Sequence, residues 1–210
     1  MTELWLIRHG ETDWNLARRI QGWRDIELNE LGRRQARRLA ERLGDEGHVF
    51  DAIYSSDLKR AHATALSVAE RLGMDVRVEP GVRERRFGVL EGLAMDDMDA
   101  HEPEASAAWR ARDPDHGLGG GESLREFHRR VVQAMDAIAA RHPGRRVLAF
   151  THGGVLDMAW RHVQGLPLTT PRHGQLLNCA INRVALADGS WRIVDWGDVD
   201  HIGSSADDIV

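Results

Sequence analysis

The chain has 210 residues, of which 42% are hydrophobic and 29% charged, a balance typical of one globular domain with a sizeable core. Its formal net charge of −5 argues against a general surface for nucleic acids or anionic membranes. Cys179 is the single cysteine, which excludes a disulfide framework and a cysteine-based zinc site. The first strand-like run begins without a secretory leader, and no apolar run approaches the ~20 residues of a membrane span. We therefore expect a cytoplasmic protein.

Strand-like and helical segments alternate along the chain. Four short apolar runs have the pattern of buried strands, at residues 4–7, 50–54, 76–79 and 146–150. Four segments have apolar residues at helical spacing or a capping signal, at residues 29–43, 57–72, from 123 onward, and 153–164. Near the end, 181–187 and 191–196 flank Asp188-Gly189, a pair typical of a hairpin turn. Residues 203–210 are predicted to be frayed.

This alternation predicts a three-layer α/β sandwich, in which a mostly parallel sheet is covered by helices on both faces. The closing hairpin indicates one antiparallel strand at an edge of the sheet. Residues 82–121 are rich in Asp, Glu, Gly and Arg and are too many for an idle loop in a compact domain. We expect a single domain over residues 1–210, with an insertion of helices and loops at about 82–121 that forms a lid over the active site.

Two of the predicted strands end on a histidine followed by glycine. One leads into Arg8-His9-Gly10 and the other into Thr151-His152-Gly153-Gly154. Ligands bind at the carboxyl edge of an open α/β sheet, so both histidines and an arginine could meet in one pocket there. A single histidine after a strand is more often a structural hydrogen-bond partner, but two in this arrangement favour a site for a phosphoryl group. A neutral imidazole can attack phosphorus, and a guanidinium fork can hold its oxygens.

A series of short motifs extends these observations along most of the chain. They are residues 6–12 (LIRHGET) with Asn15, 21–22 (QG), 28–32 (LNELG) with 35–36 (QA), 55–61 (SSDLKRA) with 64–65 (TA), 83–84 (RE) with 87–88 (FG) and 91–92 (EG), 120–123 (GGES), and 151–154 (THGG). The series resembles the histidine phosphatase superfamily, in its phosphoglycerate-mutase-like branch, and follows the order of motifs in that family.

The resemblance implies a role for each of five catalytic residues. His9 would form a phosphohistidine, and Arg8, Arg60 and a protonated His152 would bind the phosphoryl oxygens. Glu84 would protonate the leaving oxygen and then accept a proton from the attacking water. Arg83, Arg85 and Arg86 lie beside Glu84 in the sequence, and such cations favour an ionised carboxyl group, which does not suit an acid. Glu91 is therefore kept as a substitute acid.

Further residues are candidates for binding the substrate. The resemblance implies that Asn15 donates a hydrogen bond and that Gln21 and Gly22 line the pocket, and Gly153 and Arg83 are included with them. Ser123 is most simply a helix cap, and Glu122 is its neighbour. The remaining histidines lack the spacing of metal ligands, so we expect no metal and no other cofactor.

Two reactions of the family remain open. Cofactor-dependent phosphoglycerate mutases have the sequence Arg-His-Tyr-Gly, here called the step, just after the acid glutamate. They also have a longer insertion with two adjacent arginines. Here the step reads RRFG at residues 85–88, and Arg110 and Arg112 are separated. We therefore expect a phosphomonoester hydrolase that acts on a small phosphorylated metabolite. A 2,3-bisphosphoglycerate-dependent mutase remains the alternative because further cations are present, at Arg85, Arg86, Arg110 and Arg112. These arginines could instead select an acidic substrate.

A third hypothesis is a non-catalytic phosphate-binding scaffold on the same fold. The presence of both a nucleophile and an acid argues against it, because a binding module needs neither. The expected partner is a small phosphomonoester, with no nucleic acid and no membrane. The sequence leaves monomer and homodimer equally open.

Overall fold

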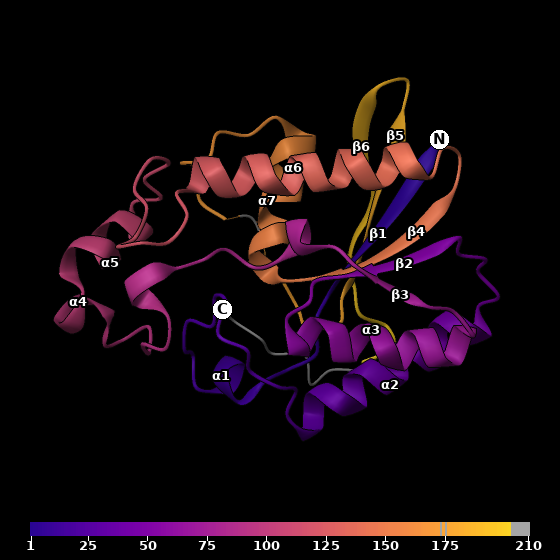
Figure 1. Cartoon of the computed structure of the whole chain (residues 1–210), viewed down its shortest axis with the longest axis horizontal. Coiled ribbons are helices and arrows are strands. Elements are labelled where there is room, and N and C mark those ends of the chain that lie inside the picture. Colours follow the sequence, from indigo (N-terminus) through magenta and orange to yellow (C-terminus); the bar gives the residue numbers. More distant parts are fainter. Residues whose placement is uncertain (173, 175, 203–210) are drawn as a thin grey trace.

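The computed structural model describes residues 1–172, 174 and 176–202, so the predicted fraying of 203–210 lies outside the described residues. Its centre is a six-stranded sheet in the order β3-β2-β4-β1-β5-β6 (Figure 1). The strands are β1 (Thr2–Arg8), β2 (Ala52–Ser55), β3 (Val76–Val78), β4 (Arg146–Thr151), β5 (Ile181–Ala187) and β6 (Ser190–Asp198). Strands β1 to β4 pair in parallel, whereas β5 pairs antiparallel with β1 and β6 antiparallel with β5.

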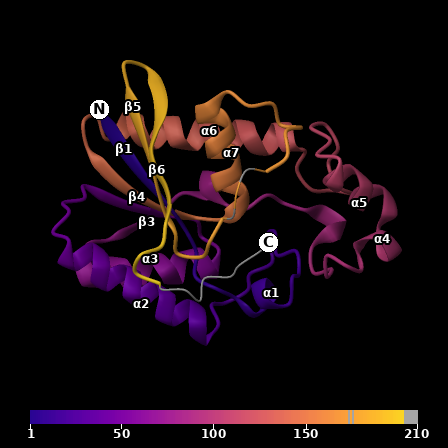
Figure 2. The same cartoon turned by 180° about the vertical axis from the view of Figure 1, so that it is seen from behind.

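Helices cover both faces of this sheet. The helices are α1 (Asp13–Leu16), α2 (Glu30–Asp45), α3 (Lys59–Leu72), α4 (Met98–His101), α5 (Pro103–Arg110), α6 (Leu124–Arg141) and α7 (Gly153–Gln164), with short 3₁₀ turns at Pro80–Val82 and Gly88–Leu90. Helices α2 and α3 lie on one face and α6 and α7 on the other, as Figures 1 and 2 show from opposite sides. The predicted three-layer α/β fold with a mostly parallel sheet is confirmed.

The core follows from the alternation of side chains along the strands. In β1, Leu4 and Leu6 point into an apolar cluster with α6 and α7, whereas Trp5 and Ile7 point into the cluster with α2 and α3. All four are almost completely buried. Because β1 is central and buried on both faces, its sequence is a nearly continuous apolar run, as expected of a parallel strand.

The predicted elements agree with the structure to within a few residues, with two differences. The hairpin contributes two strands at the edge of the sheet, β5 and β6, rather than one. The short helix α1 was not predicted, because its four residues are too few to show a helical period. Its capping box, in which Thr12 and Asn15 exchange hydrogen bonds, defines it instead. Among the described residues, no helix has the length and apolarity needed to cross a bilayer.

Residues 82–121 lie to one side of the sheet, where α4 and α5 extend beyond the strands (Figures 1 and 2). This segment has a small apolar cluster of its own, built from Leu90, Met98, Ala105 and Leu118 together with Ile20 from the first loop region. An isolated bridge between Arg19 and Ala94 joins the two parts of the chain. The segment is therefore packed on residues that follow β1.

Candidate active site

The carboxyl ends of β1 and β4 open into a cavity of about 550 Å³. Most of the residues proposed from the sequence line it: Arg8, His9, Asn15, Gln21, Gly22, Arg60, Glu84 and Gly153. Its outer wall comes from the segment at 82–121 and from α6 and α7, and includes Phe87, Trp109, Leu124, Phe127 and Met158. The cavity thus combines a polar floor at the edge of the sheet with a wall in which these apolar side chains stand among charged ones, namely Arg85, Arg110, Arg112, Asp157 and Arg172.

The register of the sheet brings the two histidines together. Arg8 in β1 pairs with Thr151 in β4, so His9 and His152 leave the sheet side by side. Their ring centroids are 5.2 Å apart. Both are buried, and the backbone N–H of His9 donates to the Thr151 carbonyl at 2.9 Å.

His9 has one ring nitrogen fixed and the other available. Its Nδ1 donates to the Gly10 carbonyl at 2.7 Å, which sets the tautomer and leaves a lone pair on Nε2. Burial lowers the pKa of His9 well below its ordinary value, and the charges of Arg60 and Arg8 lower it further. The ring is therefore neutral at physiological pH, the form that a nucleophile requires.

His152 has a different environment. Its Nε2 forms a hydrogen bond with the Ser56 hydroxyl at 2.9 Å, and its buried Nδ1 has no hydrogen-bond partner among the described residues. Burial, followed by the charge of Arg60, lowers the pKa of His152 well below its usual value. The expected protonated His152 is thus not what the protein's own charges favour. A phosphoryl dianion would supply the opposite charge that raises this pKa.

Two arginines occupy the floor of the cavity. Arg8, the last residue of β1, donates to the Leu176 carbonyl. Arg60, in the first turn of α3, donates to the carbonyls of Gly22 and Arg24 at 2.8 and 2.9 Å, while its buried Nε has no partner within the described part of the chain. Burial lowers the pKa of Arg60 to about 10, so it remains charged at neutral pH. Two buried guanidinium groups beside the histidines favour an anionic ligand.

Three residues of the first loop region shape the entrance. Asn15 lines the cavity, and its Oδ1 accepts hydrogen bonds from the N–H and hydroxyl of Thr12, which leaves its amide nitrogen as the side-chain group that can donate. The Oε1 of Gln21 is buried without a hydrogen bond among the described residues. Gly22 has a φ of +52° and lies so close to Glu91 that a Cβ there would overlap its carboxylate.

The carboxyl group of Glu84 is held by two backbone groups. Its Oε1 accepts from the Arg85 N–H at 2.7 Å, and its Oε2 accepts from the Gly154 N–H at 3.0 Å, at the beginning of α7. Glu84 therefore faces the same cavity as His9 while being attached to the turn that follows His152. A side chain in this position can exchange a proton with a group bound at His9.

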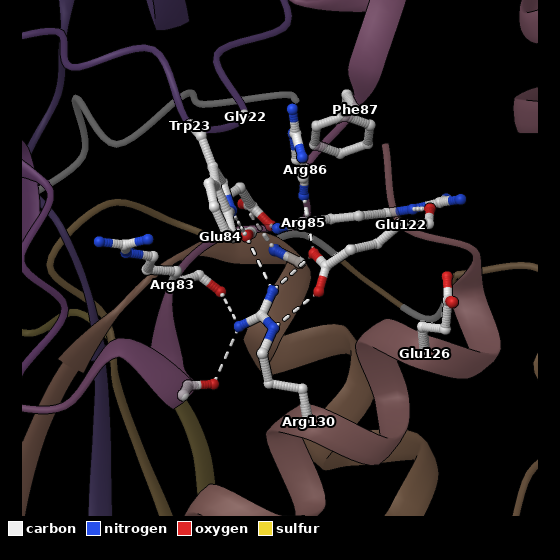
Figure 3. Close-up of polar contacts among 12 residues, drawn as sticks. Gly22, Trp23, Arg83, Glu84, Arg85, Arg86, Phe87, Glu122, Glu126 and Arg130 are labelled. Atoms are coloured by element: carbon white, nitrogen blue, oxygen red, sulfur yellow. Dashed lines mark hydrogen bonds and ion pairs between the residues drawn. The ribbon is translucent and has the colours of Figure 1, made fainter. Parts of the chain in front are cut away.

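The arginines beside Glu84 in sequence point in different directions from it (Figure 3). Arg83 forms a fork-like pair with Asp57 and stacks on the ring of Trp23, with its guanidinium carbon 4.7 Å from the ring centroid. Arg86 lies over the same ring at 5.7 Å. Arg83 was expected to bind substrate, but it lies outside the cavity because Asp57 and Trp23 retain its side chain.

Glu91 does not replace Glu84. Its Oε1 accepts from the backbone N–H groups of Trp23 and Phe87, both at 3.0 Å, and it does not line the cavity. Glu91 thus ties the first loop region to the segment at 82–121. Of the two candidate acids, Glu84 lines the cavity and Glu91 does not.

Several residues that support the site were missed by the sequence analysis. Asn178 donates to the His9 carbonyl at 2.6 Å, and the Cys179 N–H donates to the Arg8 carbonyl at 3.0 Å. The Thr64 hydroxyl accepts from the Gly10 N–H and donates to the Arg60 carbonyl. Thr64 belongs to a motif, whereas Asn178 follows β4 and α7 by many residues and no local pattern marks it. No group of three or more potential metal ligands occurs within the described residues.

Comparison with known proteins places this geometry in a family. Residues 4–199 match the model of the histidine phosphatase superfamily, branch 1. The metal-independent phosphoserine phosphatase of Arabidopsis thaliana is 43% identical over 206 residues, which cover 97% of this chain and 84% of the relative. Phosphoglycerate mutase-like protein 4 of the same plant is 39% identical over 203 residues, or 95% of this chain and 86% of the relative.

A solved structure agrees with this result. The mycobacterial glucosyl-3-phosphoglycerate phosphatase, whose structure was determined as a complex with VO3, superposes with a TM-score of 0.80 at 33% sequence identity. The match covers 94% of this chain and 99% of that one. The resemblance inferred from the sequence motifs is confirmed.

The lowered pKa values of His9 and His152 predict how stability depends on pH. In the unfolded chain both rings have ordinary pKa values and take up protons below about pH 6.5, which the folded protein resists. The free energy of unfolding should therefore fall as the pH is lowered from 7.5 to 5.5, by up to ~1.4 kcal/mol per pH unit for each ring.

Urea unfolding in phosphate-free buffer measures this dependence. His9→Asn and His152→Asn should each flatten the decline, and the exposed His101→Asn controls for loss of a histidine elsewhere in the chain. A decline that stays as steep in both buried-site variants as in the wild type would contradict the assignment of two neutral, buried imidazoles.

Proposed function

Because the chain belongs to branch 1 of the histidine phosphatase superfamily, we propose that it is a phosphomonoester hydrolase that acts through a phosphohistidine at His9. The observation that carries this proposal is the neutral, tautomer-fixed His9 in one cavity with Arg8, Arg60 and the carboxyl group of Glu84. A nucleophile, anion-binding groups and a proton donor are the parts that phosphoryl transfer needs.

In the first step, Nε2 of His9 attacks phosphorus and the bond from phosphorus to the ester oxygen breaks. Arg8, Arg60 and Asn15 donate to the phosphoryl oxygens. His152, whose ring lies 5.2 Å from that of His9, would donate as well through its Nδ1, which has no hydrogen-bond partner among the described residues. Glu84 gives its proton to the departing alkoxide, so the alcohol leaves neutral. In the second step, Glu84 accepts a proton from water as the water oxygen attacks phosphorus. The nitrogen–phosphorus bond breaks, and His9 returns neutral with inorganic phosphate released.

The proposed reaction uses no cofactor, because the nucleophile, the anion donors and the acid all come from the chain. The alternative, a mutase dependent on 2,3-bisphosphoglycerate, would need further cations for a second phosphate. Arg86 does not line the cavity. Arg110 and Arg112 line it, but each is paired with a carboxylate, Asp99 and Asp157 respectively. These pairings support hydrolysis, and the phosphoglycerate mutase-like relative keeps the mutase reaction as the alternative to test.

The substrate that we propose is a small phosphorylated metabolite with a second acidic group. Arg85 lines the cavity and is 3% exposed, and among the described residues its guanidinium group donates to the carbonyls of Glu122 and His116. Burial lowers its pKa to about 10, so it is a charged group without a carboxylate in contact. Two similar proteins are named for phosphoserine and glucosyl-3-phosphoglycerate, which both carry a carboxylate beside the phosphate. The segment at 82–121 would then act as the lid over this substrate.

A panel of phosphomonoesters without added metal tests the proposal, with a parallel incubation of 3-phosphoglycerate and 2,3-bisphosphoglycerate. We expect release of inorganic phosphate that His9→Ala abolishes, and much less isomerisation than release. Dominant isomerisation would replace the hydrolase with the mutase. No reaction in either assay, with phosphate still bound, would favour a non-catalytic phosphate-binding module.

The two glycines that begin α7 provide a matched pair of variants for the acid. A Cβ at Gly154 would overlap Glu84 Oε1, whereas a Cβ at Gly153 would meet its nearest neighbour, Arg8 Nε, at an ordinary 3.5 Å. Gly154→Ala should therefore displace the Glu84 carboxyl group and lower kcat/KM for alkyl phosphates by roughly 100-fold. Gly153→Ala should change it only slightly. Similar losses in both variants would argue that the turn tolerates no side chain for reasons unrelated to Glu84.

A further inference from the structure

An ion pair that does not line the cavity lies behind Glu84. Arg130 is on α6, and Glu122 precedes that helix by two residues. The guanidinium group binds the carboxylate as a fork, with Nε to Oε1 and Nη2 to Oε2 both at 2.7 Å. Both side chains are about one-fifth exposed. Such a two-point pair fixes the orientation of the guanidinium plane as well as its position.

The remaining donors of Arg130 reach the backbone that leads up to and includes Glu84 (Figure 3). Nη1 donates to the carbonyls of Gly81 and Arg83, and Nη2 donates to the carbonyl of Glu84 itself, each at 3.0 Å. The Trp23 indole also donates to the Glu84 carbonyl, at 2.8 Å. One side chain therefore binds three carbonyls within four residues of irregular chain.

Glu122 holds the next residues of the same segment. Its Oε2 accepts from the Arg86 N–H at 2.9 Å, and its own N–H donates to the Arg86 carbonyl at 2.8 Å. Its carbonyl accepts from Arg85 Nε at 2.9 Å. The Glu122–Arg130 pair thus binds the chain before, at and after Glu84, whose own stretch at residues 83–87 lies outside any helix or strand.

This arrangement matters because the Glu84 carboxyl group depends on the backbone for its position. One of its oxygens is bound by the N–H of Arg85, the residue that follows it. A shift of the segment would move this N–H and the Glu84 Cα together, and would break the second contact, to Gly154. The charge of Arg130 is opposed by Glu122 in direct contact, so the pair adds little net charge near the acid.

The geometry points to Arg130, fixed by Glu122, as a positioning residue for the proton-donating Glu84. This inference rests on the acid role of Glu84 in the proposed hydrolase. Arg130 does not line the cavity, so we expect it to act on the reaction through the placement of Glu84. Its loss should therefore resemble the loss of the acid and not the loss of the phosphoryl-binding groups.

Leaving-group dependence provides a readout that a merely structural role would not change. We compare kcat/KM, which reports the steps up to phosphoenzyme formation, for β-glycerophosphate and for p-nitrophenyl phosphate, whose leaving group needs little protonation. Arg130→Met should lower kcat/KM for the alkyl ester by roughly 100-fold and lower the alkyl-to-aryl ratio at least about tenfold. Arg129→Met, an exposed neighbour on the same helix, is the matched control and should change neither value.

Three further variants separate the possible outcomes. Glu84→Gln should show the same selective loss, and Arg130→Met/Glu84→Gln should be no slower on the alkyl ester than Glu84→Gln alone. Glu122→Gln, with thermal unfolding measured alongside, should shift the alkyl-to-aryl ratio in the same direction even if Arg130→Met does not fold. Equal losses on both esters in Arg130→Met and Glu122→Gln, with a selective loss in Glu84→Gln, would overturn the positioning role. Equal losses in Glu84→Gln itself would overturn the acid role and the inference with it.

Discussion

The parallel pairing of β1 with β4 is the constraint on which the site depends. It sets Arg8 opposite Thr151, so the histidines that follow both strands emerge at the same level, with ring centroids 5.2 Å apart. The sheet buries these groups, and Arg60 reaches them from α3. Burying a guanidinium group is costly unless it is hydrogen-bonded, and the carbonyls of Gly22 and Arg24 meet part of that need for Arg60. The result is a cationic floor at which the nucleophilic imidazole is held neutral.

His9 and Glu84 lie in one cavity, but their different contacts suit them to different roles in the proposed reaction. Burial and the charges of Arg60 and Arg8 keep His9 unprotonated, while the carboxyl oxygens of Glu84 accept from the backbone N–H groups of Arg85 and Gly154. The three arginines adjacent to Glu84 in sequence contact Asp57, aromatic rings or backbone carbonyls instead. The Glu122–Arg130 pair joins α6 to this segment. Catalysis in the proposed hydrolase therefore depends on an irregular segment that is held from the side away from the substrate.

Much of this arrangement could be predicted from the sequence, because strand periodicity and the His-Gly motifs are local signals. They indicated the fold class, the meeting of His9 with His152, and the pocket residues from Arg8 to Gly22. The failures concern side-chain direction in irregular segments. The sequence at 83–86 does not show that Arg83 pairs with Asp57. The sequence at 129–130 does not show that Arg129 is exposed while Arg130 binds three carbonyls. The letters around His152 also do not show that burial and Arg60, which is distant in sequence, lower its pKa in the absence of a bound anion.

The central claim is that the phosphoryl group passes through Nε2 of His9, and trapping the intermediate tests it most directly. The enzyme is mixed with ³²P-labelled substrate, quenched within the first turnover, and digested so that the labelled peptide can be sequenced. The account predicts label that is stable in alkali and lost in acid, on the peptide that contains His9, and absent in His9→Ala. Label on a serine, an aspartate or His152 would contradict it.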